Sequence, residues 1–136
     1  NVFRPADINE TLECWEIALK SNNTPSAIAL SRQKVPYINP QNSKENNIHS
    51  KVVSMPCMEL FDKQSEDYRK DVLEENSLIV TLEAGSIVSW QKYTNSNGIS
   101  LGIDKFGESA PYKEVYNYLD LTEEKITSFI QKKLRE

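Results

Sequence analysis

One arginine has the chemistry and the setting of a phosphate-binding residue. Arg32 closely follows residues 27–30, an apolar run typical of a strand that is buried on both faces. In open α/β sheets, ligands gather beyond the carboxyl ends of the strands. A guanidinium also offers a planar fork of donors that fits phosphate oxygens in pairs. The residues alone leave open the alternative that Arg32 is a solvated or ion-paired arginine at a strand end.

Arg4 and Asp7 invite a catalytic interpretation, but their pattern favours structural roles. Asp7 precedes a helical pattern, and Glu10 follows it by three positions, which is the capping-box spacing. We therefore expect Asp7 to cap a helix. We expect Arg4 to form a structural ion pair.

Three acidic residues lie in loops that follow expected strands: Glu83, Asp104 and Glu108. A pair of carboxylates could perform glycosidase-like acid–base chemistry. Nothing in their spacing supports such a pair, so we expect hydrogen bonds that fix the loops.

The two cysteines, Cys14 and Cys57, have no CxxC spacing and fit a reducing compartment better than a disulfide framework. Cys57 follows a proline at an expected helix start, where the helix dipole could lower the pKa of its thiol. No histidine is near in sequence, because the only one is His49. A buried, inert thiol is the favoured interpretation, and a histidine-based metal site or a Ser/His triad is not expected.

The elements that must position these residues alternate between strands and helices. Apolar runs predict strands at residues 27–30, 51–55, 78–82 and 99–103. Helical spacing predicts helices at residues 6–20, 58–64, around 68–72, 112–119 and 122–134. This order predicts an α/β class fold with three αβα layers and a mostly parallel sheet.

Several aromatic and apolar residues are expected to pack in the core. Residues 8, 12, 15 and 19 fall on one face of the first expected helix. Trp15 and Trp90 both lie on such apolar faces. The helical spacing of Tyr112, Tyr116 and Tyr118 favours packing over the stacking of nucleic-acid bases.

The glycines give no phosphate-binding loop. The three glycines at 98, 102 and 107 do not form the GxGxxG pattern of such loops. We expect them at turns or at close approaches of the backbone.

The charge of the chain excludes two classes of partner. The formal net charge is −4, so no positive field attracts nucleic acid or an anionic membrane surface. No apolar run approaches the roughly 20 residues of a membrane span. The chain is expected to bind neither nucleic acid nor membrane.

Seven short motifs resemble consecutive landmarks of the transketolase family and come in the family's order. They are Phe3-Arg4-Pro5-Ala6-Asp7, Ala29-Leu30-Ser31-Arg32-Gln33, Val52-Val53-Ser54-Met55-Pro56, Glu59-Leu60-Phe61-Asp62, Glu83-Ala84-Gly85, Gly102-Ile103-Asp104-Lys105-Phe106-Gly107 and Ser109-Ala110-Pro111-Tyr112-Lys113-Glu114. The resemblance spans nearly the whole chain. It implies a transketolase C-terminal-domain-like fold.

The resemblance implies a division of the chain and a set of roles. Residues 1–38 correspond to the end of the pyrimidine-binding domain, residues 39–47 to a linker or deletion point, and residues 48–136 to an incomplete C-terminal domain. The family transfers a two-carbon ketol unit between sugar phosphates in the pentose phosphate pathway, with thiamine diphosphate and Mg²⁺. We expect the intact enzyme to be cytoplasmic and, like the family, a homodimer. Arg32 matches the family's arginine that holds the substrate's terminal phosphate.

The chain departs from the family's pattern in two ways. It begins at Asn1, so the resemblance places the cofactor, metal and catalytic residues upstream, and we expect none of them here. Between Gln33 and Val52 the family carries a further strand and helix, for which this chain has too few residues. The chain alone is therefore expected to be inactive. A non-catalytic remnant, an interaction module and the C-terminal subunit of a split enzyme stay open as alternatives.

Loss of a strand–helix unit has a physical consequence. It leaves unpaired backbone edges and uncovered apolar surface, which favour association with another chain. We expect the isolated chain to associate or to be marginally stable.

Overall fold

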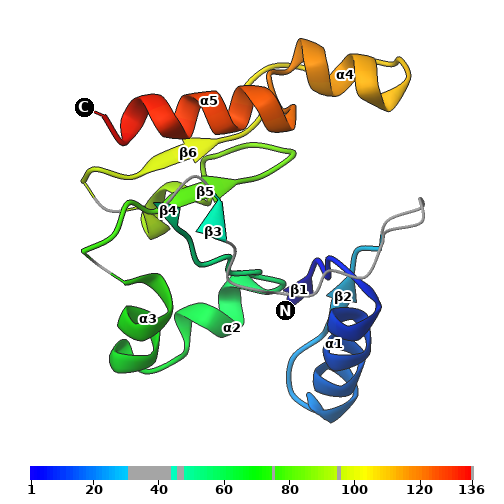
Figure 1. Ribbon diagram of the computed structural model, residues 1–136. Coiled ribbons are helices and arrows are strands. Elements are labelled where there is room, and N and C mark those ends of the chain that lie inside the picture. Colours follow the sequence, from blue (N-terminus) through cyan, green and yellow to red (C-terminus); the bar gives the residue numbers. More distant parts are fainter. Residues whose placement is uncertain (31–43, 46–47, 75, 95, 136) are drawn as a thin grey trace. The chain divides into compact units, whose positions relative to one another are not determined.

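The computed structural model describes residues 1–30, 44–45, 48–74, 76–94 and 96–135. The chain forms two compact units, Asn1–Val72 and Leu73–Glu136. Both units combine strands with helices, and each contains a pair of parallel strands joined by a helical segment (Figure 1). This arrangement confirms the α/β class.

The first unit begins with a strand–helix–strand segment. Strands β1 (Val2–Phe3) and β2 (Ala27–Ile28) pair in parallel, and helix α1 (Ile8–Lys20) connects them. Val2 lies opposite Ala27 and Phe3 opposite Ile28. Parallel strands need such a crossover because the chain must return from the C-terminal end of the first strand to the N-terminal end of the second.

Helix α1 begins with the capping box that the sequence predicts. The Asp7 carboxylate accepts a hydrogen bond from the Glu10 backbone N–H at 3.0 Å. The Glu10 carboxylate in turn accepts from the Ala6 backbone N–H at 2.7 Å. Both bonds satisfy N–H groups around the start of the helix, where backbone donors lack an intrahelical acceptor.

The core of the first unit is small and lies between α1, the β1–β2 pair and α2 (Met58–Asp62). Phe3, Cys14 and Cys57 are its buried members, and Phe3 is only 1% exposed. Ala18, Ile28 and Leu60 pack against them. The unit also contains the antiparallel pair β3 (Lys44–Glu45) and β4 (Ile48–His49), and helix α3 (Glu66–Leu73) ends at its boundary.

The strand predicted at residues 51–55 is wrong. These residues form no strand in the structure, and the side chains of Val52 and Val53 are 71% and 41% exposed. A strand exists only where a neighbour completes its hydrogen-bond ladder. No described strand pairs with this segment.

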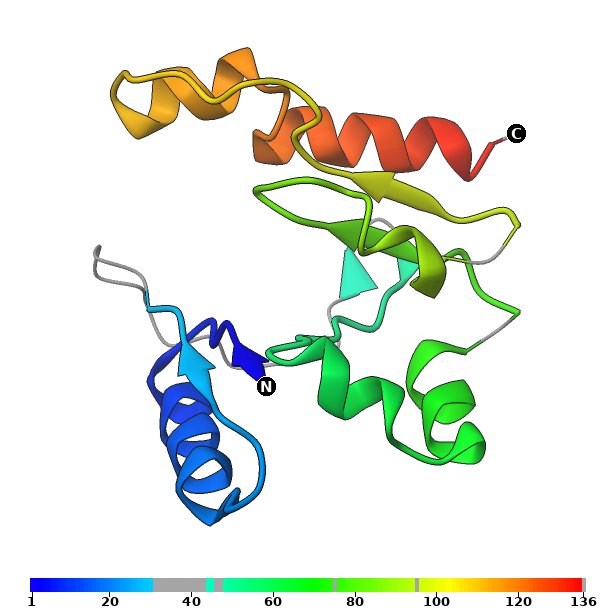
Figure 2. The same cartoon turned by 180° about the vertical axis from the view of Figure 1, so that it is seen from behind.

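The second unit contains a parallel pair of strands and two final helices. Strands β5 (Val80–Leu82) and β6 (Ile99–Leu101) pair over three residues, and the 3₁₀ turn η1 (Gln91–Tyr93) lies between them in sequence. The Thr81 hydroxyl donates to the Ser100 hydroxyl across the pair at 2.9 Å. Helices α4 (Tyr112–Tyr118) and α5 (Glu123–Lys133) follow. Helix α5 runs alongside β6 in both views (Figures 1 and 2).

Burial is lower than the sequence pattern predicts. Trp15 is 50% exposed, which corrects its placement in the core, whereas Trp90 is half-buried. The expected burial of residues 27–30 on both faces is also wrong, since Leu30 is 58% exposed. On α5, Phe129 is 53% exposed. Two-stranded sheets with few covering helices have too little area to bury every apolar face that the sequence presents.

Candidate functional site

Arg32, the residue expected to hold substrate phosphate, lies outside the described residues. The structure describes the chain up to Leu30, with β2 ending at Ile28. The parallel pairing of β2 with β1 confirms that the residues before Arg32 include a strand of an α/β unit. Phosphate binding by Arg32 stays a prediction.

Arg4 and Asp7 lie on either side of the β1–α1 turn. Asp7 is the N-cap of α1, so its structural role is confirmed. The Arg4 backbone N–H donates to the Pro56 carbonyl at 2.7 Å, which ties the end of β1 to the segment before α2. The ion pair expected for Arg4 stays a prediction.

Glu83 fixes the loop that follows β5, as expected. Its carboxylate accepts a hydrogen bond from the Trp90 indole N–H at 3.1 Å. In the same loop, the Gly85 carbonyl accepts from the Ile103 backbone N–H at 2.7 Å. The bond to Trp90 holds Glu83 within this loop. The side chains of Asp104 and Glu108, in contrast, are exposed. This arrangement supports a structural role for Glu83.

The glycine expected at a close approach of the backbone is Gly102. A Cβ atom at this position would lie 2.6 Å from the Gly85 carbonyl oxygen and 2.6 Å from Cγ2 of Ile87. Nothing lies within 4 Å of such an atom at Gly107. Only Gly102 of these two therefore depends on the absence of a side chain.

Cys57 is a buried thiol rather than an activated one. Burial is the largest cause that raises its pKa above the ordinary value of 9.0, and its Sγ donates to a Glu59 carboxylate oxygen at 3.2 Å. Burial likewise raises the pKa of Cys14. A raised pKa keeps both groups in the unreactive thiol form at neutral pH. The burial that the sequence favoured is confirmed, and the inertness of the thiols stays a prediction.

Both thiols are expected to resist modification until the first unit unfolds. Treating the native chain with a disulfide reagent at pH 7 should label neither Cys14 nor Cys57 rapidly, because both side chains are buried and mainly protonated. In urea both should react as fast as a free thiol. The measurement is the absorbance of the thiolate that the reagent releases. Fast labelling of either cysteine in the native chain would contradict the burial.

A hollow in the second unit lies between the end of β6 and helix α5. Its volume is about 790 Å³. Its lining combines apolar residues with charged ones of both signs: Leu101, Gly102, Ile103, Asp104, Lys105, Leu119, Asp120, Leu121, Glu124, Lys125, Ile126, Ser128, Phe129 and Lys132. Three of the lining residues are lysines, whose charge would suit an anionic ligand. The contacts of these lysines determine whether they are free to bind one.

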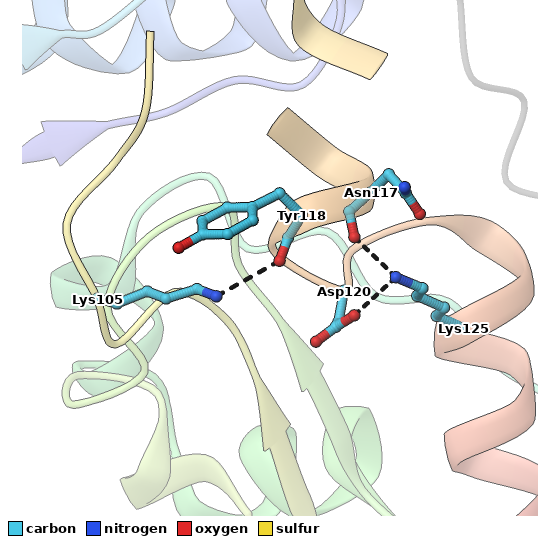
Figure 3. A network of polar contacts seen from close by, with 5 residues as sticks. All are labelled: Lys105, Asn117, Tyr118, Asp120 and Lys125. Carbon is cyan, nitrogen blue, oxygen red and sulfur yellow. Dashed lines mark hydrogen bonds and ion pairs between the residues drawn. The ribbon is translucent and has the colours of Figure 1, made fainter. Parts of the chain in front are cut away.

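Two of these lysines cap the C-terminal end of α4 (Figure 3). Lys125 Nζ donates to the Asn117 carbonyl and to Asp120 Oδ1, both at 2.7 Å. Lys105 Nζ donates to the Tyr118 carbonyl at 3.4 Å and lies 4.0 Å from the centre of the Tyr118 ring. The last carbonyls of a helix lack intrahelical donors and carry the negative end of its dipole. Lysines at this end stabilise the turn and are not free cations.

The turn itself has a left-handed residue. Asp120 has φ of 60°, and the Leu121 backbone N–H donates to the Tyr116 carbonyl at 2.9 Å. The Asp120 N–H donates to the Asn117 carbonyl at 3.3 Å, which completes a Schellman motif. The sequence pattern did not predict this turn because glycine usually occupies that position. One feature of the sequence could have indicated the turn: Asp120 lies between two leucines, where one helical pattern ends and the next begins.

The ion pair of Asp120 is expected to make stability depend on acid pH. The hydrogen bond and charge of Lys125 lower the pKa of Asp120 below its ordinary value of 3.8. Its contribution is therefore present above pH 3.8 and is lost as the pH falls through the lowered value. Asp120→Asn keeps the shape and tolerates positive φ. Urea unfolding should show a small deficit of this variant at pH 7 that disappears at strongly acid pH; an equal deficit at both would exclude the ion pair as its cause.

The aromatic residues of α4 are not core residues. Tyr112 is 70% exposed and Tyr118 54% exposed, so the packing expected for them inside the protein is wrong. Tyr112 instead stacks edge-on against Tyr116, with ring centres 6.5 Å apart.

The described residues offer no cluster of side chains that fits the metal ion of the family that the motifs resemble. No group of three or more His, Cys, Asp or Glu side chains among them could hold a metal ion. Lys105 and Lys125 beside the hollow already bind carbonyls and a carboxylate. In the described residues, no helix combines the length and apolarity needed to cross a membrane.

Comparisons with known proteins agree on one family. A family model described as the transketolase-like TK C-terminal domain matches residues 40–122. A transketolase of Sinorhizobium medicae is 33% identical over 94% of this chain and 24% of its own length. A solved transketolase from Campylobacter jejuni is 30% identical and has a TM-score of 0.84 over 96% of this chain and 26% of that one. A Pichia stipitis transketolase solved with sedoheptulose 7-phosphate is 26% identical, with a TM-score of 0.87 over 98% and 25%.

These comparisons also show how much of its relatives this chain spans. It spans about a quarter of the length of the curated relatives it matches. The aligned stretch of the Sinorhizobium relative is 169 positions long, whereas this chain has 136 residues. The alignment therefore contains positions of the relative that have no counterpart here. The match of sequence, family model and fold shows that the chain belongs to the transketolase family and corresponds to a C-terminal portion of it.

Proposed function

We propose that this chain is part of a transketolase that transfers a two-carbon ketol unit between sugar phosphates in the pentose phosphate pathway. The observation that carries the proposal is the match to transketolases over 94% of the chain at 33% identity. Thiamine diphosphate and Mg²⁺ would supply the carbanion chemistry, and other parts of the protein would hold them. This portion of the enzyme would supply scaffold and dimer contacts.

We propose that residues 1–38 end a pyrimidine-binding domain, that residues 39–47 are a linker or deletion point and that residues 48–136 form an incomplete C-terminal domain. The start of the family match at residue 40 supports this division. The parallel β1–α1–β2 segment supports the assignment of the first part. The missing strand–helix unit would lie between Gln33 and Val52.

Arg32 is the proposed substrate contact of this portion. A guanidinium just beyond a strand end can hold a terminal phosphate through paired hydrogen bonds. A solved relative is described in complex with sedoheptulose 7-phosphate, a phosphorylated sugar. The intact enzyme is proposed to be a cytoplasmic homodimer, and the two free cysteines fit a reducing compartment.

Replacing Arg32 tests the substrate contact in the complete enzyme. Arg32→Gln removes the charge, so we expect the KM for a phosphorylated sugar to rise about 10- to 100-fold, because a hydrogen bond to a charged group contributes about 1.5–3 kcal/mol. The KM for the unphosphorylated sugar should not change. Arg32→Lys should recover part of the loss because it restores the charge without the fork. An equal effect on both sugars would contradict phosphate recognition.

A second candidate is a non-catalytic remnant or the C-terminal subunit of a split enzyme. The relative's unmatched positions favour it, because a lost unit disturbs the fold. The two candidates differ in the polypeptide that cells contain. Mass spectrometry of the native protein gives either 15.6 kDa, the mass of this chain, or the larger mass of a complete transketolase. For a 15.6 kDa chain, ketol transfer should appear only after mixing with a separately encoded N-terminal subunit, and its absence would leave the remnant.

A further inference from the structure

The turn that leads into strand β6 contains an asparagine followed by a glycine. Asn97 is the only asparagine in the chain that precedes a glycine. Ser96 and Asn97 lie in this turn, Asn97 is exposed to solvent, and β6 begins two residues later at Ile99. An amide side chain in an exposed turn is open to attack by the backbone nitrogen that follows it. Such a reaction is intramolecular, so it requires no substrate, cofactor or partner.

We propose that Asn97 and Gly98 are a site of spontaneous deamidation in the folded chain. The Gly98 backbone nitrogen, once it loses its proton, attacks the side-chain carbonyl carbon of Asn97. A new C–N bond closes a succinimide ring, and the side-chain nitrogen leaves as ammonia. Water then opens the ring at either carbonyl carbon and yields aspartate or isoaspartate. The net reaction converts an amide and water into a carboxylate and an ammonium ion, with no change in oxidation state.

Glycine is the residue that lets the nitrogen reach the side chain. A Cβ atom on the attacking residue would crowd the ring as it closes, and Gly98 has none. Asn97 precedes β6 rather than lying within it, so the strand ladder does not hold its backbone extended. None of the described glycines has a positive φ, so alanine can adopt the backbone conformation of Gly98. Gly98→Ala therefore removes the space for the ring without straining the folded turn.

Asn76 provides a comparison within the same chain. It is also exposed and lies in a turn, but Ser77 follows it. Ser77 carries a Cβ atom, and its backbone N–H donates to the Glu74 carbonyl at 2.8 Å. The nitrogen that would have to attack Asn76 is therefore both crowded and held in a hydrogen bond. Asn76 should keep its amide under conditions in which Asn97 loses it.

The two products differ in their effect on the second unit. Each adds one negative charge to a chain whose formal net charge is −4, since a carboxylate replaces a neutral amide. In isoaspartate the main chain also runs through the former side chain, which lengthens it by one carbon atom directly before β6. At the start of this strand the Ile99 backbone N–H donates to the Ile79 carbonyl at 3.0 Å, and Ile99 lies opposite Val80. The longer backbone displaces Ile99 from this bond, so isoaspartate weakens the β5–β6 pair and aspartate does not.

Peptide mapping of the purified 136-residue chain tests the site. The native chain is incubated at neutral and at mildly alkaline pH, and mass spectrometry follows the replacement of NH₂ by OH, with fragment ions that separate position 97 from Asn95. Conversion at Asn97 should be several-fold faster than at Asn76 and should rise with pH, because the attacking nitrogen must lose its proton. In Gly98→Ala, conversion at Asn97 should fall to the rate at Asn76. Equal rates at the two asparagines in the native chain, or an unchanged rate in Gly98→Ala, would overturn the proposal.

The stability of the products tests the effect on the strand pair. Anion exchange separates the aged chain, which carries one more negative charge, and enzymatic methylation of isoaspartyl groups identifies the isoaspartate form. Urea unfolding followed by circular dichroism should give this form a lower midpoint than the fresh chain. Asn97→Asp is the matched control, because it adds the same charge without the extra backbone atom, and its midpoint should equal that of the fresh chain. An isoaspartate form as stable as Asn97→Asp would overturn the proposed weakening of the β5–β6 pair.

Discussion

Replacing Phe3 with alanine is expected to lower the free energy of unfolding of the first unit by about 3–5 kcal/mol. Phe3 is 1% exposed and belongs to the core cluster with Cys14 and Cys57. The loss has two parts. The variant no longer buries the apolar area of the ring, and the neighbouring side chains cannot close the cavity that the ring leaves. Because whole domains are stable by only about 5–15 kcal/mol, this single change is large enough to unfold a small unit.

Phe106→Ala is the matched control for this experiment. Phe106 is 96% exposed, so truncating its ring removes almost no buried area. Urea unfolding of both variants, followed by circular dichroism, should leave the control within about 0.5 kcal/mol of the unmodified chain. Equal losses in the two variants would show that the core does not lie around Phe3.

The second large effect is expected at Gly102. In Gly102→Ala, the new Cβ would lie 2.6 Å from the Gly85 carbonyl oxygen and 3.1 Å from the Glu83 carbonyl oxygen. Both atoms belong to the backbone of the loop after β5, which is held by the bonds from Ile103 and from Trp90. The loop must move and weaken these bonds, so we expect a loss of about 1–3 kcal/mol in the second unit.

Gly107→Ala provides the control because no atom lies within 4 Å of the position that its new methyl group would occupy. Alanine there should be neutral or stabilise the chain by up to about 1 kcal/mol, since it restricts the unfolded state. The denaturant midpoints of both variants give the comparison. A Gly102→Ala variant as stable as Gly107→Ala would mean that the β6 end and the Glu83–Gly85 loop do not approach closely.

The polar contacts that the sequence predicted correctly are local ones. Asp7 and Glu10 form the capping box, because three residues of spacing and one turn of helix bring them together without help from the rest of the chain. Glu83 was expected to fix its loop, but its partner Trp90 is seven residues away and could not be named in advance. The prediction specified the kind of contact and not the partner.

The errors concern burial. Trp15 lies on the predicted apolar face of its helix, but the described chain leaves it 50% exposed. Val52 and Val53 have strand-forming side chains, but no described strand offers them a ladder. Both predictions assumed a complete set of neighbours. Alternation and helical spacing report which face is apolar, whereas the neighbour that covers the face depends on residues elsewhere.

The α/β class, most of the helices and the family follow from the order of residues, because they depend on periodicity, capping residues and short motifs along the chain. Three other features became visible only in the folded chain: Lys105 and Lys125 cap α4 beside the hollow, Gly102 meets the Gly85 carbonyl, and Leu12 and Leu19 of α1 are largely exposed. Each of these is a distance between atoms far apart in sequence or an area left open to water, and such quantities exist only once the chain has folded.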